Sequence, residues 1–403
     1  MTSLWRNREF TLLWTSQSLS DLGNAIASLA VPLLVLVLTG SPVQAGVVAT
    51  VVQVVDLACR LPAGMLADRL DRRRTMLGCD VVRLVLWVGL GAAVATGRAT
   101  LVVIIAVAVI DAIGSTLFQT AEQASLRSIV PAVQLPAAVA RNEARSYGTS
   151  LAGPPLGGLL FGLGHAVPFA GNAVSYLLSL IGVALIRKPL QGPREQAPAS
   201  HGAAMAEGVR FVFGHAFLRT VLLIAAPLNF AFTGFLFSVV VILQRHGTAP
   251  AVIGLAETIV GVGGLLGAFA APALQSRISF SLLVRAFCWA GAALLAVSSL
   301  LTASVLVAVP IGILVFLAPA CNAALFGYQA AITPDRLQGR VLSVVRLVAM
   351  SAAALAPLLS GFVIDAWGGP ATILVFAAAI AGSGIAATLS RAIGTMRPLE
   401  TVE

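Results

Sequence analysis

The sequence predicts an all-α membrane protein with twelve transmembrane helices, arranged as two six-helix, pseudo-symmetric halves around a central cavity. Composition is the first observation behind this expectation, because 58% of the 403 residues are apolar and only 10% are charged. Soluble globular proteins carry about 25% charged residues, and a soluble fold could not bury so much apolar surface. The other two observations are a series of long apolar stretches and an internal repeat.

Each predicted helix starts from an apolar stretch that is long enough to cross a bilayer, which takes about 20 residues. Every backbone polar group in lipid needs a partner within the chain, so these stretches are helices and not isolated strands. In chain order they cover residues 11–38, 45–66, 76–96, 101–122, 143–163, 167–186, 220–243, 250–273, 282–301, 305–325, 341–364 and 370–390.

A polar stretch separates the sixth apolar stretch from the seventh. It covers residues 187–219, is rich in Gly, Pro, Gln and Ser, and includes an amphipathic segment at 205–213. The predicted organisation is an N-terminal six-helix half over 1–190, a cytoplasmic linker over 191–219 and a C-terminal six-helix half over 220–403.

The two halves also look duplicated. A constant offset of 203 residues aligns four helix-breaking residues of the first half with identical residues of the second, which are Gly64 with Gly267, Pro131 with Pro334, Pro154 with Pro357, and Gly158 with Gly361. Repeated six-helix halves place a binding cavity at their interface, near the middle of the membrane.

The distribution of basic residues predicts the orientation. The net charge is +9, and the basic residues gather in alternate loops, which the positive-inside rule assigns to the cytoplasm. The opposite loops hold only Arg98 and Arg245. We therefore expect a multi-pass protein of the bacterial inner membrane with both termini in the cytoplasm. Nothing resembles a nucleic-acid-binding patch.

The loop after the second span contains a recognisable motif, Gly64-Met-Leu-Ala-Asp68-Arg69-Leu-Asp71-Arg72-Arg73-Arg74. It resembles the signature of the major facilitator superfamily between helices 2 and 3. The resemblance implies that Asp68 acts as a latch on the positive N-terminal end of the eleventh helix, near Gly339 and Arg340. The expected gate residues are Gly64, Asp68, Arg69, Arg72 and Arg73, although the arginines would also serve as membrane-surface anchors in any such protein.

The fifth span contains Gly153-Pro154-Pro-Leu-Gly157-Gly158, which resembles the core of the antiporter motif in exporters of the superfamily. Ordinary small-residue helix packing is the alternative interpretation. Further segments, among them Glu207-Gly-Val-Arg210-Phe, are similar to the macrolide-efflux and enterobactin-exporter branch of the drug:proton antiporters. The arginine that the superfamily carries in the middle of helix 4 is absent, and Asp111 is the charged residue there, so that arginine's role cannot be transferred.

Three carboxylates lie at about the same depth in the predicted membrane. At 1.5 Å per residue, Asp21, Asp56 and Asp111 are each roughly 15 Å from the cytoplasmic end of their helix. Such residues are costly in a bilayer and usually functional, so we predict that they couple transport to protons. Asp21 and Asp111 are the better candidates, because neither has a basic residue one helical turn away and both are taken to lack a partner, whereas Asp56 has Arg60 and a structural ion pair is the alternative there. A structural role is also the alternative for Asp21 and for Asp111, which a polar partner on helix 1 or 2 would satisfy. Replacing Asp56 by Asn is expected to strand Arg60 and reduce folding yield.

Five further polar residues lie within the predicted spans, and they are expected to line the substrate cavity: Asn24, Gln53, Asn229, Glu257 and Asn322. Hydrogen bonds between helices are the alternative for the amides. Arg83 and Arg346 are expected near the cytoplasmic surface, as snorkelling anchors or gate partners.

These features favour a secondary active transporter and not an enzyme. The four histidines and four cysteines have no metal-ligand spacing, and no nucleotide-binding or hydrolase motif occurs. We therefore expect no cofactor and no metal. The predicted function is export of an amphipathic small molecule (a drug, natural product or siderophore) by proton antiport with alternating access, as a monomer in the lipid bilayer. An importer or facilitator of a small solute, or a transport-inactive membrane scaffold, are the alternatives.

Overall fold

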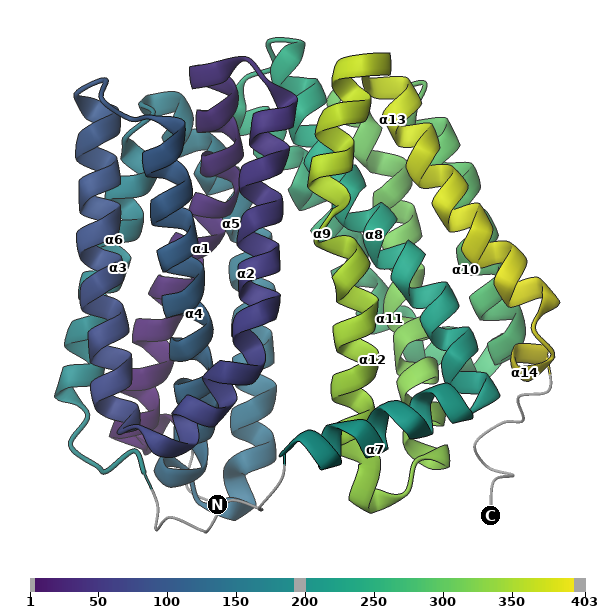
Figure 1. The fold of residues 1–403 in the computed structure, drawn as a ribbon, viewed down its shortest axis with the longest axis horizontal. Coiled ribbons are helices and arrows are strands. Elements are labelled where there is room, and N and C mark those ends of the chain that lie inside the picture. The colour runs from purple at the N-terminus through teal and green to yellow at the C-terminus, as the bar shows by residue number, and fades with distance from the viewer. Residues whose placement is uncertain (1–3, 192–200, 395–403) are drawn as a thin grey trace. The chain divides into compact units, whose positions relative to one another are not determined.

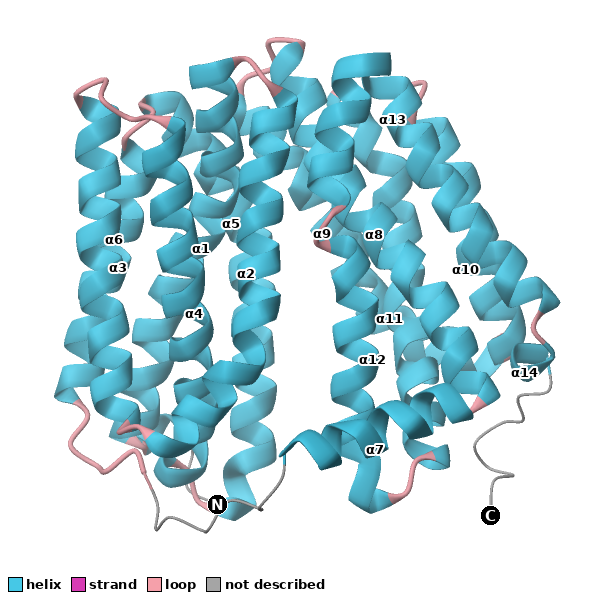
Figure 2. Cartoon of the chain, in the orientation of Figure 1, coloured by secondary structure: helices cyan, strands magenta, loops and turns pink. Residues whose placement is uncertain are grey.

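The computed structural model describes the backbone of residues 4–191 and 201–394. The side chains of Leu61, Asp68 and residues 201–205 lie outside this description. The described chain is helical and contains no β-strand (Figure 2), so the predicted fold class, an all-α membrane protein, is confirmed.

Six long helices form the first part of the chain (Figure 1). Four of them begin at a side chain that accepts a hydrogen bond from the first helical turn, namely Asn7, Ser41, Asp71 and Thr100. Such caps bond backbone N–H groups that would otherwise lack a partner. The helices are α1 (Arg8–Thr39), α2 (Pro42–Arg69), α3 (Arg72–Ala95), α4 (Leu101–Ile129), α5 (Leu135–Leu163) and α6 (Val167–Leu185).

The second part of the chain begins with the short helix α7, continues with longer helices and ends with the single turn α14 (Figure 1). They are α7 (His201–Gly214), α8 (Ala216–Arg245), α9 (Pro250–Arg277), α10 (Phe280–Ser298), α11 (Ala308–Ile332), α12 (Gln338–Ala353), α13 (Ala356–Leu389) and α14 (Arg391–Gly394). Single 3₁₀ turns lie at Leu4–Arg6, Ala132–Gln134, Val305–Val307 and Asp335–Leu337.

The eleventh predicted span, 341–364, is not one helix. It is interrupted between Ala353 and Ala356, and the chain then continues in α13 through the twelfth span. Pro357 explains the interruption, because proline cannot donate to the preceding turn and is tolerated only in the first turn of a helix. Within α13, Gly368 has φ 80° and Pro370 follows it, so a kink separates the last two spans at residues suited to one.

The helices are long and apolar enough to cross a membrane. Ten helical stretches within the described residues meet this condition, and one of them, Asp335–Leu389, covers the last two predicted spans. The fifth predicted span is not among the ten, because its Gly, Pro, Ser and Thr residues lower its mean hydropathy. These observations are consistent with twelve crossings.

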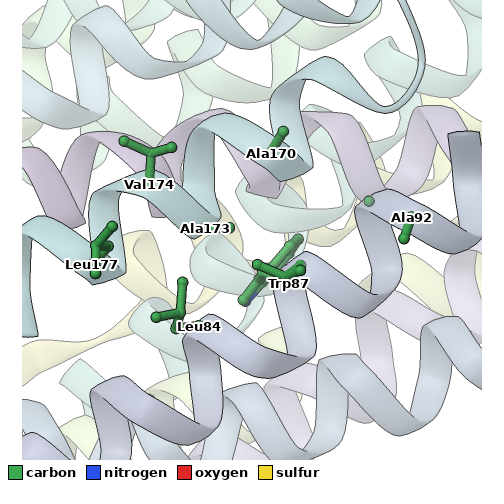
Figure 3. A pocket seen from close by; sticks show the side chains of 9 residues that line it. Leu84, Trp87, Ala92, Ala170, Ala173, Val174 and Leu177 are labelled. Carbon is green, nitrogen blue, oxygen red and sulfur yellow. The ribbon is translucent and has the colours of Figure 1, made fainter.

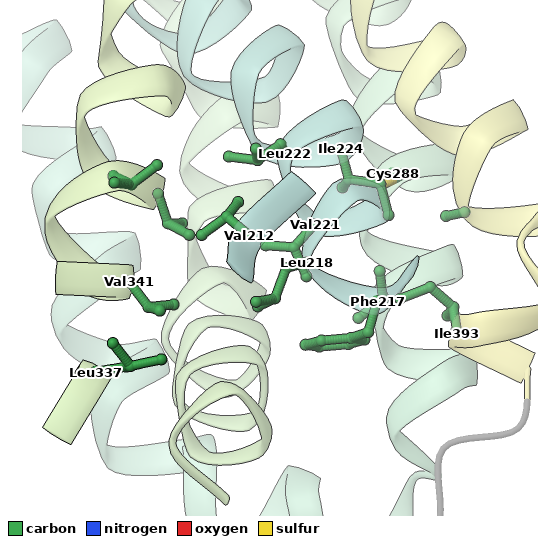
Figure 4. Close-up of a cluster of buried hydrophobic side chains, with 14 residues drawn as sticks. Val212, Phe217, Leu218, Val221, Leu222, Ile224, Cys288, Leu337, Val341 and Ile393 are labelled. Atoms are coloured by element: carbon green, nitrogen blue, oxygen red, sulfur yellow. The ribbon is translucent and has the colours of Figure 1, made fainter. Parts of the chain in front are cut away.

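Contacts divide the chain into two units: residues 1–196 with 248–258, and residues 197–247 with 259–403. In the first unit, α1 packs on α5 and α6, α3 packs on α4 and α6, and α2 packs on α4. In the second, α8 packs on α12 and α13, and α10 packs on α11 and α13. Figure 4 shows the core of the second unit, where side chains from α7, α8, α10 and α12, including Val212, Leu218, Cys288 and Val341, meet without solvent.

The amphipathic segment expected at 205–213 is part of α7, which packs against α12. Val212 is buried, and Gly208 lies directly against Arg340. The carboxylate of Glu207 accepts hydrogen bonds from Arg336 and, at 2.5 Å, from Arg340. The bond from Arg336 is the main reason why the pKa of Glu207 lies below its usual value.

Candidate functional site

The interior of the first unit contains polar side chains that recur on one face of each helix. On α1 these are Gln17, Asp21 and Asn24, and on α3 they are Asp80, Arg83 and Trp87. On α6 they are Asn172, Tyr176 and Ser179. Spacings of three and four residues keep side chains on the same face of a helix. Since α1 and α3 both pack on α6, these faces meet inside the bundle.

Arg83 is the centre of the first cluster. Its side chain is 3% exposed, and its Nε donates to Asp111 Oδ1 at 2.9 Å. Its Nη2 donates to Asn24 Oδ1 at 3.1 Å, and its guanidinium lies over the ring of Tyr176. Trp87 Nε1 donates to the same Asp111 oxygen at 2.7 Å, and the Tyr176 hydroxyl bonds to both Asn24 and Asp111. The cluster thus satisfies a buried ion pair with neutral donors.

Arg145 forms a second cluster with two acids. Its Nε lies 2.9 Å from Asp21 Oδ2, and its Nη2 lies 2.9 Å from Glu122 Oε1. The side chains of Arg145 and Glu122 are each 8% exposed. The three residues come from α1, α4 and α5. One guanidinium therefore pairs with two carboxylates. When both acids are ionised, the cluster has a net charge of −1, which one proton or one further positive charge would neutralise.

Asp56 belongs to a third cluster near the surface of the unit. Its Oδ2 pairs with Arg60 at 2.8 Å, and its Oδ1 accepts from Thr116 at 2.8 Å. The ion pair expected from the sequence is therefore present. The Arg60 side chain is 54% exposed on the surface of the unit, and the reduced folding yield expected for Asp56→Asn stays a prediction.

The three predicted proton-coupling carboxylates lie in one unit, but each has a different partner. The assumption that Asp21 and Asp111 lack basic partners is wrong, because arginines from other helices reach both. Arg83 is likewise a buried ion-pair partner and not a snorkelling anchor. Sequence reasoning also missed Glu122. Its signal was the spacing from Asp111, which leaves both acids on one face of α4.

The gate motif forms the end of α2 and the start of α3. Asp71 accepts from the Arg74 backbone N–H at 2.8 Å, and Arg69 lies in the last turn of α2. Arg72 donates to the carbonyls of Ala124 and Leu190, and Arg73 donates to that of Ala184. A Cβ at Gly64 would meet nothing within 4 Å. The side chain of Asp68, the expected latch, lies outside the described residues.

The antiporter-like motif provides a surface of small residues on α5. A Cβ at Gly153 would overlap Ala25, and one at Gly157 would lie 2.7 Å from the Ile26 carbonyl oxygen. On the adjacent face, Gly158 lies against the carbonyl of Pro250 in the segment of α9 that belongs to this unit. Pro154 approaches Gly254 of the same segment in the same way. The motif thus allows the backbone of α5 to approach the backbone of α1 on one face and that of α9 on the adjacent face.

Replacing Gly157 by Ala should destabilise the protein by about 1–3 kcal/mol, because α1 and α5 must move apart. Gly162→Ala is the matched control on the same helix, since a Cβ there would meet nothing within 4 Å. The control should be neutral or slightly stabilising, as helical Gly→Ala changes often are. Thermal unfolding of the purified proteins in detergent measures both, and equal melting temperatures would contradict the close approach.

The expected cavity residues have different environments. Asn24 bonds to Arg83 and Tyr176, as its alternative interpretation proposed, and Asn229 donates to Ala225 in its own helix. Asn322 is exposed, and Gln53 is partly buried in α2. Glu257, in α9, has no ion-pair or hydrogen-bond partner among the described residues.

A pocket of about 320 Å³ lies between α3 and α6 of the first unit (Figure 3). Its lining is apolar and does not include any of the expected cavity residues; it consists of Leu84, Trp87, Val88, Gly91, Ala92, Ala170, Ala173, Val174 and Leu177. Figure 3 shows Trp87 in its wall, and the indole of this residue also bonds to Asp111.

A family model that matches almost the whole chain identifies the class of protein as a membrane transporter of the major facilitator superfamily, which confirms the resemblance of the loop motif. The chain belongs to the transmembrane secretion effector family, whose model matches residues 2–401. It is therefore a transporter and not an enzyme.

Two relatives are named multidrug efflux pump Tap. The protein of Mycolicibacterium fortuitum is 25% identical over 381 residues, covering 87% of this chain and 88% of that protein. The protein of Mycobacterium tuberculosis (strain ATCC 25618 / H37Rv) is 28% identical over 398 residues, covering 91% and 89%.

Solved structures support the fold alone. A bacterial homolog of the human lysosomal transporter Spinster superposes with a TM-score of 0.73 at 17% identity, over 96% of this chain and 95% of that one. A bacterial homologue of the iron transporter ferroportin gives 0.73 at 17%, over 96% and 99%. The nucleoside transporter NupG gives 0.73 at 14%, over 96% and 100%.

Proposed function

We propose that the chain exports amphipathic small molecules from the bacterial cytoplasm by proton antiport with alternating access. The names of the relatives favour drug efflux. The main support for coupling between proton entry and substrate export is the cluster of Asp21, Glu122 and Arg145, in which two carboxylates share one guanidinium inside a membrane domain. The relatives' name supports a drug as the substrate, and the resemblance to the macrolide-efflux and enterobactin-exporter branch adds natural products and siderophores as candidates.

Proton exchange at this cluster has a simple electrostatic basis. A buried carboxylate without a compensating charge is costly, so the second acid of the pair is stable when it holds a proton or lies near a cationic substrate. A proton and a cationic substrate can therefore compete for the same carboxylate. Asp111 is the second proposed coupling residue, because its partner Arg83 is also engaged by neutral groups that can adjust. Asp56 is the third.

Transport into inverted membrane vesicles with an imposed pH gradient tests the proposal. An exporter accumulates substrate in vesicles that are acidic inside, and collapse of the gradient with a protonophore abolishes this accumulation. Equilibration of the substrate across the membrane at a rate that does not depend on the pH gradient would indicate a facilitator, and accumulation in right-side-out vesicles would indicate an importer. Absence of transport for every compound tested, in protein shown to be folded, would favour the scaffold interpretation.

Orientation can be measured by labelling single cysteines. With Cys59, Cys79, Cys288 and Cys321 removed, we expect an impermeant thiol reagent to modify cysteines placed at 97–99 or 245–248 from outside intact cells. Cysteines at 69–74 or 191–203 should react only after lysis. Modification of position 195 from outside would overturn the proposed cytoplasmic termini.

The proposed latch is tested by Asp68→Asn, which keeps the size of the side chain and removes its charge. We expect a protein that is expressed and inserted but transports poorly, because the cytoplasmic gate loosens. Asp71→Asn is the matched control in the same loop, since Asn also caps helices well and Asp71 caps α3. Wild-type transport rates in Asp68→Asn would argue against the latch.

A further inference from the structure

We propose that Asp80 is an additional proton-binding carboxyl of this transporter, and that Asp80 and Asp111 take turns as the partner of Arg83. The role of this exchange in transport rests on the proposed proton antiport. The protonation of Asp80 does not, and can be measured separately.

Asp80 is fully buried and makes hydrogen bonds only through neutral groups. Ser179 Oγ donates to Asp80 Oδ2 at 2.7 Å, and Gln17 Nε2 donates to Ser179 Oγ at 2.9 Å. The second carboxylate oxygen, Oδ1, is buried and has no hydrogen-bond partner among the described residues. An ionised carboxylate with one neutral hydrogen bond and one bare oxygen is strongly disfavoured away from water. Protonation removes the charge, so this environment favours the neutral acid.

The charged groups near Asp80 do not change this conclusion. Arg83 and the thiol of Cys79 are neighbours on α3, Glu122 faces it from α4, and the phenol of Tyr176 on α6 lies beside Arg83. From α1 it meets the uncharged Gln17, through Ser179. Glu122 adds repulsion, and the nearest cation, Arg83, is bonded elsewhere.

Arg83 can serve either acid. Asp80 and Arg83 are three residues apart on one face of α3, a separation at which side chains can meet. In the present arrangement Arg83 bonds to Asp111. When a cationic substrate or a proton neutralises Asp111, the guanidinium is free to turn to Asp80. Asp80 then gives up its proton to a water molecule.

The exchange is balanced in charge. One positive charge arrives at Asp111 and one proton leaves Asp80, so the buried cluster keeps its net charge. Avoiding an uncompensated charge in the bilayer is what makes such a step feasible. The structure thus assigns Arg83 to two carboxyls, as it assigns Arg145 to Asp21 and Glu122.

Infrared spectroscopy of the protein in lipid nanodiscs tests whether Asp80 is protonated. At neutral pH we expect a carbonyl stretching band of a protonated carboxylic acid that is present in the wild type and lost in Asp80→Asn. Ser179→Ala should shift the band to higher frequency, since it removes the hydrogen bond to Oδ2. This second variant keeps the test decisive if Asp80→Asn does not fold. A spectrum in which neither variant alters the band would show that Asp80 is ionised and would overturn the proposal.

Asp111→Asn tests the exchange without altering Asp80. It releases Arg83, so the Asp80 band should disappear as Asp80 ionises and pairs with the guanidinium. Asp365→Asn, at an exposed ion pair of the second unit, should leave the band unchanged. Persistence of the band in Asp111→Asn would overturn the exchange. The infrared measurement does not depend on transport. A protein that shows the band but no gradient-driven efflux would therefore refute the proposed function and still support the protonation of Asp80.

Discussion

Asp21→Asn should abolish efflux driven by a pH gradient while the binding of neutral substrates survives. The asparagine fills the same space but cannot lose or gain a proton, and it leaves Arg145 with Glu122 as its sole acidic partner among the described residues. The cluster then has matched charges throughout the cycle and no longer responds to pH. Asp111→Asn should have the same effect on efflux, because Arg83 loses the partner at which a cation can compete.

Two measurements check this result. Proton release on substrate addition to purified protein, followed between mildly acidic and mildly alkaline pH, should be lost or reduced in both variants. Substrate binding by equilibrium dialysis should stay within about threefold of wild type for neutral compounds, a change below about 0.7 kcal/mol. Asp365→Asn is the matched control and should behave as wild type. If both Asp21→Asn and Asp111→Asn release protons normally, coupling lies elsewhere, and Glu257, which has no partner among the described residues, is the next residue to replace.

Arg83→Met should be the most destabilising single substitution in the first unit, at about 3–5 kcal/mol. Methionine retains the aliphatic length of the side chain but leaves Asp111 without its cation, and the bond to Asn24 and the contact with Tyr176 are lost as well. Thermal unfolding in detergent measures the effect. It is a property of the fold and does not depend on which substrate is transported.

A double substitution separates lost charge from lost packing. Arg83→Met combined with Asp111→Leu strands no charge, and well-packed apolar replacements of buried ion pairs are often neutral or stabilising. The double variant should therefore recover most of the stability. Arg245→Met, at an exposed pair with Asp365, serves as the control and should change stability by about 1 kcal/mol or less. Equal destabilisation by Arg83→Met and Arg245→Met would contradict the buried role of Arg83.

The close packing of α5 matters for these tests. Gly153 and Gly157 lie against α1, which carries Asp21, and Arg145 lies on the same helix α5. The helix approach set by the glycines thus holds the guanidinium of Arg145 within reach of Asp21. The Gly157→Ala variant is therefore expected to weaken coupling as well as stability.

The sequence by itself determined the class of protein. Every segment that spans the bilayer must be apolar and must bond its own backbone polar groups. The apolar stretches therefore predict the all-α membrane fold. The motif that begins at Gly64 predicts the transporter superfamily. The ion pair of Asp56 with Arg60 was also predictable, because one helical turn fixes the distance between neighbouring side chains.

Only the tertiary structure decided which charges meet. Asp21 and Arg145, or Arg83 and Asp111, lie on different helices, and no local rule relates their rotations about the helix axes. Those rotations are set by packing, through contacts such as Gly157 on Ile26 and Gly23 against Ser175 and Asn172. A residue that looks unpaired along the chain, such as Asp111, can therefore be the best satisfied. Asp80, which drew no notice in the sequence, is buried with a bare oxygen, because the energy of a charge in the membrane depends on its surroundings in three dimensions.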